Sequence, residues 1–202
     1  MHQTYSRHAV LSELATFDKE SGNLRIVVES PKGSRNKYKY NPACDCLELA
    51  TALPEGMVFP YDFGFLPGTI GQDGDPLDVL VLMDAPVAPG CVIRGRLIGA
   101  FEARQREKKQ KDWVKNDRLV AVACHAQTHQ DAKTLNDLRP RMPQEISEFF
   151  VEYNKLRGRE FETLDICGPR KAMKIAERGI TMFKKQRRKT EKSTNPGKAA
   201  QA

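Results

Sequence analysis

Three aspartates, Asp73, Asp75 and Asp78, lie within six residues in the segment QDGDPLDVLVLM, where an apolar stretch begins at the third of them. Carboxylates this close repel one another unless solvent or a cation neutralises their charge. Gly74 and Pro76 favour a turn, so the three side chains are expected to converge on one concavity. A ligand set made only of oxygen favours Mg²⁺, Mn²⁺ or Ca²⁺ over zinc. The spacing therefore predicts a divalent-cation site, against the simpler interpretation of a solvated acidic turn.

Two other kinds of metal site fit the sequence less well. An EF-hand loop counted from the first aspartate requires Gly at its sixth position and Glu at its twelfth, but this chain has Asp78 and Asp84 there. Cys124, His125 and His129 supply three donors without a fourth. That arrangement is more typical of a strand end and its loop than of a zinc site.

The elements that would position the aspartates are strands in the first two thirds of the chain and helices in the last third. Residues 143–156, and those that follow Pro169, place apolar side chains at helical spacing. We expect a closed antiparallel barrel with helices packed outside it. The strand candidates are rich in β-branched or alternating apolar residues and are separated by Gly, Pro and Asn: 24–30, 37–40, 46–53, 78–83, 91–103 and 118–124.

Length, charge and composition limit the classes of protein. With 202 residues the chain suits one domain of ordinary size. Six of its seven net positive charges fall in residues 184–202, so we expect one domain over 1–183 and a basic, disordered tail over 184–202. A nearly neutral body argues against specific nucleic-acid recognition. No apolar run approaches a membrane span and no signal peptide is visible, which predicts a cytoplasmic protein with reduced cysteines and no membrane partner.

The segment GMVFPYDFGFLPGTIGQDGDPLDVLVLMDAPVAPG resembles the central part of the soluble family I inorganic pyrophosphatases. The signature of that family is Asp, a small residue, Asp, Pro, an apolar residue and Asp, followed by an apolar strand. The resemblance implies an α+β fold: a closed antiparallel five-stranded β-barrel, OB-like, with flanking helices. It also implies hydrolysis of pyrophosphate to two phosphates with Mg²⁺, or with Mn²⁺ in its place. A homo-oligomer is expected, since bacterial-type relatives are hexamers.

Metal-binding roles follow from the resemblance, residue by residue. The three aspartates of the signature are expected to hold the activating metals, and Asp75 also accepts the proton of the metal-bridging water. Two further metal carboxylates are expected in the loop before the strand at 118–124. Asp112 and Asp117 keep a suitable separation, although strict strand register places Asn116 at the second position. We favour Asp117 there.

Substrate-binding roles are carried over in the same way. Glu29 matches an acidic residue near the metal-bound water, with a surface charge at a strand end as the alternative. Lys37 and Arg118 match cations that contact phosphate. Tyr153 matches a tyrosine that donates to the electrophilic phosphate. Lys155 is the expected substitute for a lysine that relatives have beside this tyrosine.

The chain departs from the family pattern at several positions around the signature. Hydroxyl and cationic groups that would touch substrate or metal-bound water are missing, and one acidic residue is replaced by a cation. These changes leave a second function open: a non-catalytic or weakly active relative that binds phosphate or polyphosphate. The departures are Lys39 for an acidic residue, Thr51 for an arginine, Phe59 and Phe63 for tyrosines, and Asn154 for a lysine.

Overall fold

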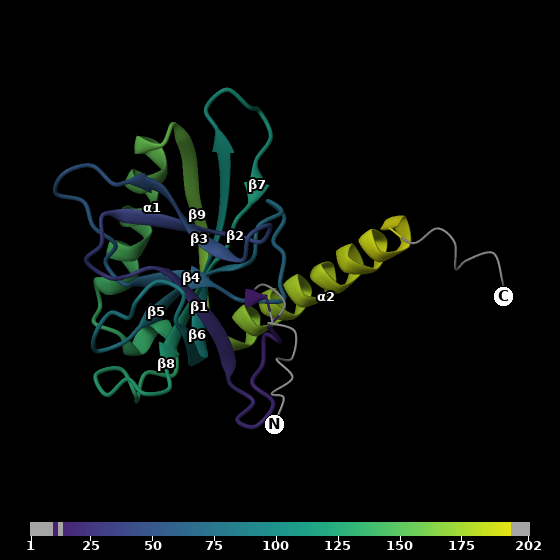
Figure 1. Ribbon diagram of the computed structural model, residues 1–202. Coiled ribbons are helices and arrows are strands. Elements are labelled where there is room, and N and C mark those ends of the chain that lie inside the picture. Colours follow the sequence, from purple (N-terminus) through teal and green to yellow (C-terminus); the bar gives the residue numbers. More distant parts are fainter. Residues whose placement is uncertain (1–9, 12–13, 195–202) are drawn as a thin grey trace.

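The computed structural model describes residues 10–11 and 14–194. Strands dominate the first two thirds and helices the last third, as predicted (Figure 1). In chain order, the elements are β1 (Leu24–Ser30), β2 (Asn36–Asn41), β3 (Cys46–Ala52), β4 (Asp62–Phe65), β5 (Asp78–Leu82), β6 (Val92–Glu107), β7 (Val114–Lys115), β8 (Arg118–Ala123), a 3-10 turn (Leu135–Asp137), α1 (Met142–Leu156), β9 (Arg159–Cys167) and α2 (Pro169–Thr194).

The main sheet is mixed rather than antiparallel throughout. Its strands follow the order β1, β4, β5, β8, β6, and β6 also pairs with β1, β7 and β9. Every pairing is antiparallel except that of β5 with β8, which is parallel, so the expected antiparallel arrangement is wrong at this pair. The physical reason is that β6 lies between β5 and β8 in the sequence. The chain reverses into β6 and reverses again into β8, which therefore runs in the direction of β5.

The strands β2 and β3 form a separate antiparallel hairpin. Three strands of the main sheet, β4, β7 and β9, were not expected from the sequence. The four residues of β4, DFGF, lie in a stretch rich in Gly and Pro, and this composition hides the strand. Gly64 is required there, because a Cβ atom at this position would lie 1.9 Å from the carbonyl oxygen of Val27 in β1.

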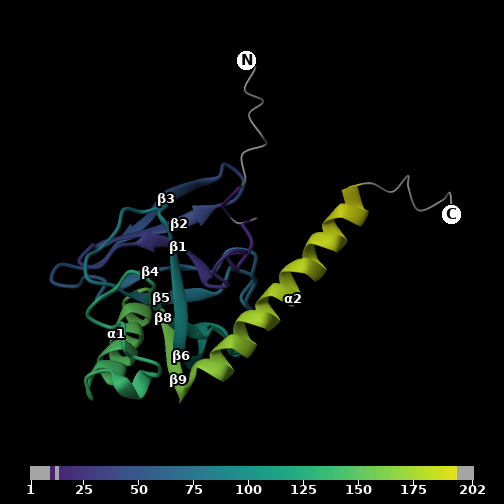
Figure 2. The ribbon, with the colours of Figure 1, turned by 90° about the horizontal axis from the view of Figure 1, so that it is seen from below.

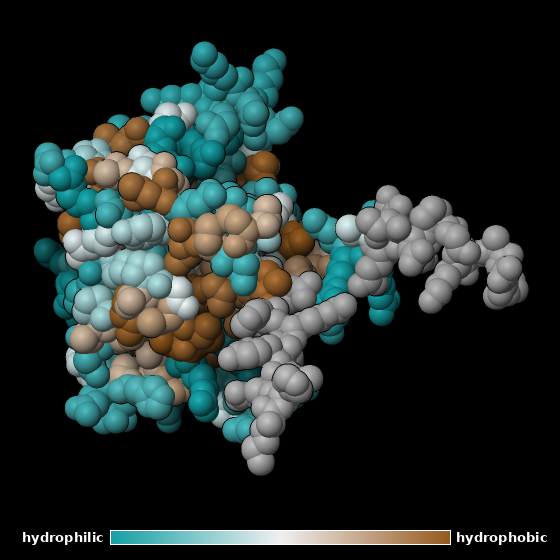
Figure 3. All heavy atoms as spheres, in the orientation of Figure 1, coloured by the Kyte–Doolittle hydropathy of each residue, from teal (hydrophilic) through white to brown (hydrophobic). Residues whose placement is uncertain are grey.

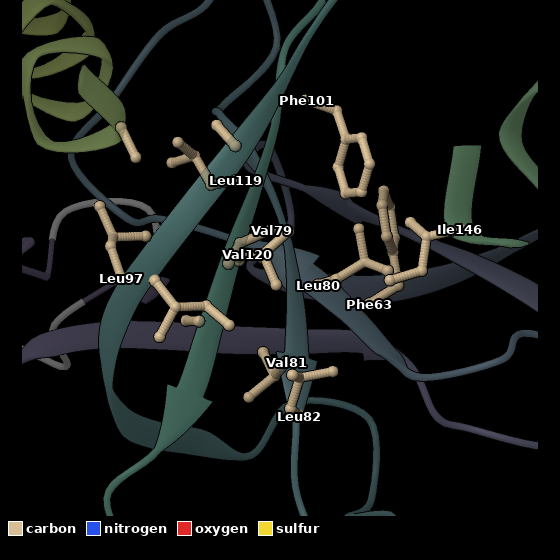
Figure 4. Packing of buried hydrophobic residues seen from close by; sticks show 14 of the residues in the cluster. Phe63, Val79, Leu80, Val81, Leu82, Leu97, Phe101, Leu119, Val120 and Ile146 are labelled. Carbon is tan, nitrogen blue, oxygen red and sulfur yellow. The ribbon is translucent and has the colours of Figure 1, made fainter. Parts of the chain in front are cut away.

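The hydrophobic core is built on the central strands. β8 is buried along its whole length because β5 and β6 flank it in the sheet. This explains why its sequence, RLVAVA, is continuously apolar after Arg118 instead of alternating. Figure 4 shows Phe63, Leu80 and Ile146 within the same buried cluster, so β4, β5 and α1 share one core.

Helix α1 confirms the predicted helix over 143–156. Pro143 lies in its first turn, where a missing N–H costs nothing. Ile146, Phe150 and Tyr153 are buried at spacings of four and three residues, which places them on one face of the helix. This face packs on β4, with the ring centroids of Phe150 and Phe63 5.8 Å apart.

Helix α2 begins at Pro169, as predicted, and its first turns pack on the sheet. Ala172, Ile175 and Ala176 are buried there. Its later turns extend away from the sheet (Figure 2). The residues 184–194, expected as part of the tail, are helical, while 195–202 lie outside the described residues, so the division at residue 184 stays a prediction. Within residues 10–11 and 14–194, no helix combines the length and apolar character needed to cross a bilayer.

The surface of the face seen in Figure 1 is not uniform. Figure 3 shows hydrophilic side chains over the hairpin that carries β7 and apolar side chains gathered over the middle of the face. The β6–β7 hairpin therefore projects into solvent.

Candidate active site

The turn that leads into β5 carries the three aspartates. The Gly71 N–H donates to the Asp75 carbonyl oxygen at 2.7 Å, and the Asp75 N–H donates to Oδ1 of Asp73 at 3.3 Å. Gly74 has φ +87°, a left-handed conformation that glycine adopts without strain. Local hydrogen bonds thus fix the turn, and Asp78 follows as the first residue of β5. The predicted turn-then-strand arrangement is confirmed.

A cleft of about 530 Å³ lies beside this turn. A second cavity of about 80 Å³ shares Asp73, Asp78 and Asn116 with it. The cleft combines several acidic groups with several cations, which suits an anionic substrate that arrives with metal. Its charged and polar lining includes Glu29 from β1, Lys37 and Lys39 from β2, the aspartates 73, 75 and 78, Arg118 from β8, and Tyr153, Asn154, Arg157 and Arg159 from the end of α1 and the start of β9.

Two of the three aspartates are paired with cations of the chain itself. The Lys39 Nζ lies 3.0 and 2.9 Å from the two carboxylate oxygens of Asp75. The Arg118 Nη1 lies 2.5 Å from Oδ2 of Asp78. Among the described residues, no lysine or arginine forms an ion pair with Asp73. Although Asp73 keeps contact with solvent, desolvation by the surrounding protein atoms, and next the charge of Asp78, raise its pKa to about 6.

The three carboxylates share the cleft without converging on one point. Within the described part of the chain, the one group of three or more His, Cys, Asp or Glu ligand atoms lying within 4.8 Å of one another is Cys44, Cys46 and Glu48. The weak zinc candidate at 124–129 is not such a group. Mg²⁺ keeps several waters and is held by one or two carboxylates, so it does not require three that converge. The oxygen-only donor set of the turn therefore fits Mg²⁺.

Glu29 and Lys37 form a buried pair at the base of the cleft. Glu29 is 6% exposed and is not a surface charge at a strand end. Its carboxylate accepts hydrogen bonds from the Lys37 Nζ at 3.0 Å and from the Tyr40 N–H at 2.8 Å. The Lys37 ammonium also lies 4.3 Å from the centroid of the Phe63 ring, a cation–π contact. Glu29 thus positions the cation predicted to contact phosphate.

Arg118 is held rigidly where β8 begins. It is 4% exposed, and its guanidinium contacts the Asn116 side-chain oxygen as well as Asp78. The rings of Phe150 and Phe161 lie 5.2 and 5.4 Å from its central carbon. Its Nε is buried with no hydrogen-bond partner among the described residues. Arg118 thus presents a rigidly held cation to the cleft, and its contact with phosphate stays a prediction.

Asp112, Asn116 and Asp117, the candidates for the further metal ligands, lie in different places in the structure. Asn116 lines both the cleft and the smaller cavity, whereas Asp117 lines the smaller cavity only. The Asp117 carboxylate accepts the Ala103 N–H at 3.1 Å and lies 3.3 Å from the Lys115 Nζ; burial is the largest cause that raises its pKa. Asp112 is exposed between β6 and β7 and lines neither cavity. Asn116, the alternative favoured by strict register, is the one that reaches the cleft.

The end of α1 supplies residues that the sequence did not reveal. Tyr153 lines the cleft and its hydroxyl contacts the Arg157 guanidinium, while Arg159 lines the same wall. Lys155 does not line the cleft; it is exposed and pairs with Glu152 at 3.1 Å. A signal for Arg157 was present in the sequence, because it lies four residues after Tyr153, on the same side of a helix.

The remaining departures lie in the aromatic wall and in the hairpin. Phe59 is buried, with ring centroids 5.8 Å from Phe149 and 6.0 Å from Tyr153. Thr51 is paired with Lys37 across β2 and β3 and does not line the cleft. Of the two phenylalanines at tyrosine positions, Phe63 therefore gives the cleft an apolar lining, and Phe59 packs behind it.

Comparisons with known proteins agree on one family. A family model for inorganic pyrophosphatase matches residues 26–184. The inorganic pyrophosphatase of Synechocystis sp. is 35% identical over 145 residues, which is 72% of this chain and 82% of that protein. The crystal structure of inorganic pyrophosphatase from Thermus thermophilus superposes with a TM-score of 0.78 at 30% identity, and the match covers 87% of this chain and 99% of that one. With its signature turn, its cleft and these similarities, the chain belongs to the inorganic pyrophosphatase family.

Proposed function

We propose that this protein hydrolyses inorganic pyrophosphate to two phosphates in the cleft. The observation that carries the proposal is the composition of that cleft, which combines the three aspartates with Lys37, Arg118 and Arg157. Pyrophosphate has several negative charges, so its hydrolysis needs cations on the phosphoryl oxygens and an activated water. One cleft offers a place for both.

The aspartate turn is the proposed Mg²⁺ site, with Mn²⁺ as the alternative ion. Asp73, Asp75 and Asp78 would hold the metal through their carboxylate oxygens. When bound, such an ion neutralises phosphoryl charge and lowers the pKa of a coordinated water. Asn116 would offer a neutral side-chain oxygen at the same edge of the cleft. Asp117 would act from the smaller cavity, and Asp112 only after a rearrangement of its loop.

The cations of the cleft are proposed to bind and orient the substrate. Lys37 is fixed by the buried Glu29 and Arg118 by the half-buried Asp78, which reduces the conformational entropy lost on binding. Tyr153 would donate its hydroxyl to a phosphoryl oxygen. Arg157 and Arg159 replace the cation expected at Lys155, whose ammonium is turned toward Glu152.

Asp75 is the proposed general base. In this structure the Lys39 ammonium occupies both of its oxygens, so proton transfer to Asp75 requires that this pair open. The side chains of Lys39 and Asp75 are 57% and 53% exposed. An exposed pair of this kind contributes no more than about 1 kcal/mol, so opening it costs little.

The same ion pair favours a second candidate function. If the Lys39–Asp75 ion pair persists when substrate is bound, the site binds phosphate or polyphosphate without activating water. Calorimetry with pyrophosphate in Mg²⁺ and Mn²⁺ buffers distinguishes the two functions. Binding with no phosphate released over hours supports the second.

A phosphate-release assay tests the first function. With pyrophosphate, the protein is expected to release phosphate in Mg²⁺ or Mn²⁺ and not in a metal chelator. Asp75→Asn is expected to lower the rate by about 10³-fold, the range for loss of a general base. Asp131→Asn, an exposed aspartate outside the cleft, is the matched control and should keep the parental rate. An unchanged rate in folded Asp75→Asn would contradict the proposal that the cleft hydrolyses pyrophosphate.

The closed, OB-like five-stranded barrel and the oligomeric state are also proposals. The pairing of β1 with β4, β4 with β5, β5 with β8, β8 with β6 and β6 with β1 supports closure. A hexamer is expected from the resemblance alone. Light scattering coupled to size-exclusion chromatography measures it, and a monomeric mass would reject it.

A further inference from the structure

The turn between β2 and β3 places two thiols side by side. The Sγ atoms of Cys44 and Cys46 lie 2.9 Å apart. Between them Asp45 has φ +49°, a left-handed conformation that is uncommon outside glycine. The Asp45 carboxylate accepts hydrogen bonds from the Tyr40 hydroxyl at 2.7 Å and from the Leu11 N–H at 3.0 Å. The backbone of the turn is thus fixed in a form that brings the two thiols together.

A carboxylate completes this group. The Glu48 Oε1 lies 3.9 Å from the Cys44 Sγ and accepts a hydrogen bond from the Asn41 side-chain amide at 2.9 Å. The amide therefore orients Glu48 toward the thiols. The three ligand atoms lie within 4.8 Å of one another, and all three residues are exposed, so an ion reaches them from solvent.

We propose that Cys44, Cys46 and Glu48 bind one thiophilic divalent cation, such as Zn²⁺ or Cd²⁺, at this turn. Two thiolates and a carboxylate are donors typical of zinc, and three protein ligands leave the fourth tetrahedral position to water. Hard ions such as Mg²⁺ prefer oxygen and do not compete for thiolates. This site differs in chemistry and in residues from the aspartate turn, and it does not depend on the proposed hydrolysis.

The geometry needs only a small adjustment to receive the ion. Two Zn–S bonds of about 2.3 Å at a tetrahedral angle separate the sulfurs by roughly 3.8 Å. The exposed thiols reach this separation by rotation of their side chains, without movement of the core. In the ion-free turn, the hydrogen bond with Cys44 is the largest cause that raises the pKa of Cys46, to about 11. A bound cation reverses this effect, so binding releases protons.

The turn adjoins the cleft, which gives the site a structural consequence. Asn41 and Glu48 line the cleft, and the hairpin that ends at the turn carries Lys37 and Lys39. An ion held at the turn would fix the end of this hairpin relative to the cleft wall.

The test is a titration of the full-length, chemically reduced protein with Cd²⁺ in excess Mg²⁺. The Mg²⁺ occupies oxygen sites, and the ultraviolet thiolate-to-metal charge-transfer band reports only ions bound to sulfur. One equivalent of Cd²⁺ is expected to saturate the band, and Zn²⁺ is expected to displace it. Cys44→Ser should weaken binding by at least about 100-fold, and Glu48→Gln by about tenfold. Cys91→Ser, another exposed cysteine, is the matched control and should bind as the parent does.

Three outcomes would overturn the proposal. They are the absence of a charge-transfer band, an equal affinity in folded Cys44→Ser, or a loss of affinity in Cys91→Ser of the same size. If the two thiols are instead a redox pair, mass spectrometry of the protein before reduction will reveal a Cys44–Cys46 disulfide. Such a disulfide, together with no ion bound after reduction, also rejects the metal site.

Discussion

The aspartate turn and the cations around it are built in different ways. The turn is local: the eight residues 71–78 fix Asp73, Asp75 and Asp78 through hydrogen bonds within the turn and the start of β5. The cations come from β2, β8 and the end of α1, so they share one cleft only after these segments, distant in the sequence, have packed together. A metal requires carboxylate oxygens at fixed spacing, whereas a phosphate accepts a donor from any side. The aspartates of the turn can therefore match the family pattern, while the cations of the cleft come from other positions than the family pattern gives.

The largest effect is expected when the carboxylate turn is broken. Asp78→Asn removes the negative charge of a proposed metal ligand and leaves the buried Arg118 guanidinium without its charge partner. We expect at least about 100-fold lower kcat/KM at subsaturating Mg²⁺, since even outer partners of a metal ligand cost up to that amount. The melting temperature of the protein should also fall. Phosphate release and circular dichroism measure the two effects, and parental values for both would contradict the importance of the turn.

A smaller effect is expected when a cleft cation outside the family pattern is removed. Arg157→Ala takes away a donor that lines the cleft and contacts Tyr153. The KM for pyrophosphate is expected to rise by about tenfold, the loss of one charge-assisted hydrogen bond. Lys155→Ala is the matched control, because its ammonium pairs with Glu152 outside the cleft. A larger KM change in Lys155→Ala than in Arg157→Ala would restore the role expected for Lys155.

A similar effect on metal binding is expected from pH. The pKa of Asp73, raised to about 6, means that this carboxyl holds a proton below that pH, and a cation binds only its deprotonated form. The Mg²⁺ affinity should therefore fall as pH falls below 6, by up to about tenfold per unit for one proton, and level off above pH 7. Calorimetry across pH 5 to 8 measures this. A flat affinity between pH 5 and 7 would contradict the combination of a raised pKa and a ligand role for Asp73.

The smallest effect is expected when Lys39, the cation paired with Asp75 of the turn, is replaced. Lys39→Gln removes the ammonium from Asp75, and the exposed pair is worth no more than about 1 kcal/mol. Mg²⁺ affinity is expected to rise by up to about fivefold, with fold stability unchanged. Calorimetry with Mg²⁺ measures the rise. A weaker affinity in the variant would mean that Lys39 supports the metal site instead of competing with it.

Much of the fold was predictable where a segment has one simple pattern. The strands β1, β5 and β8 and the helix α1 have continuous apolar runs or a helical stripe, and each forms where it was expected. The strand β9, REFETLDIC, was missed because charged residues occupy much of it, and pairing with β6 stabilises it. The parallel pairing of β5 with β8 has no local signal either. It follows from the path of β6 between them.

The sequence by itself determined the carboxylate turn, because its spacing, its glycine and the following strand act over a few residues. It also determined that the surrounding cations differ from the family pattern. Only the tertiary structure decided that Asn116 rather than Asp117 lines the cleft, that Lys155 pairs with Glu152 outside it, and that Arg157 and Arg159 line it. The physical reason is that these side chains are placed by strand register and by helix packing. Both are set by contacts between segments distant in the chain.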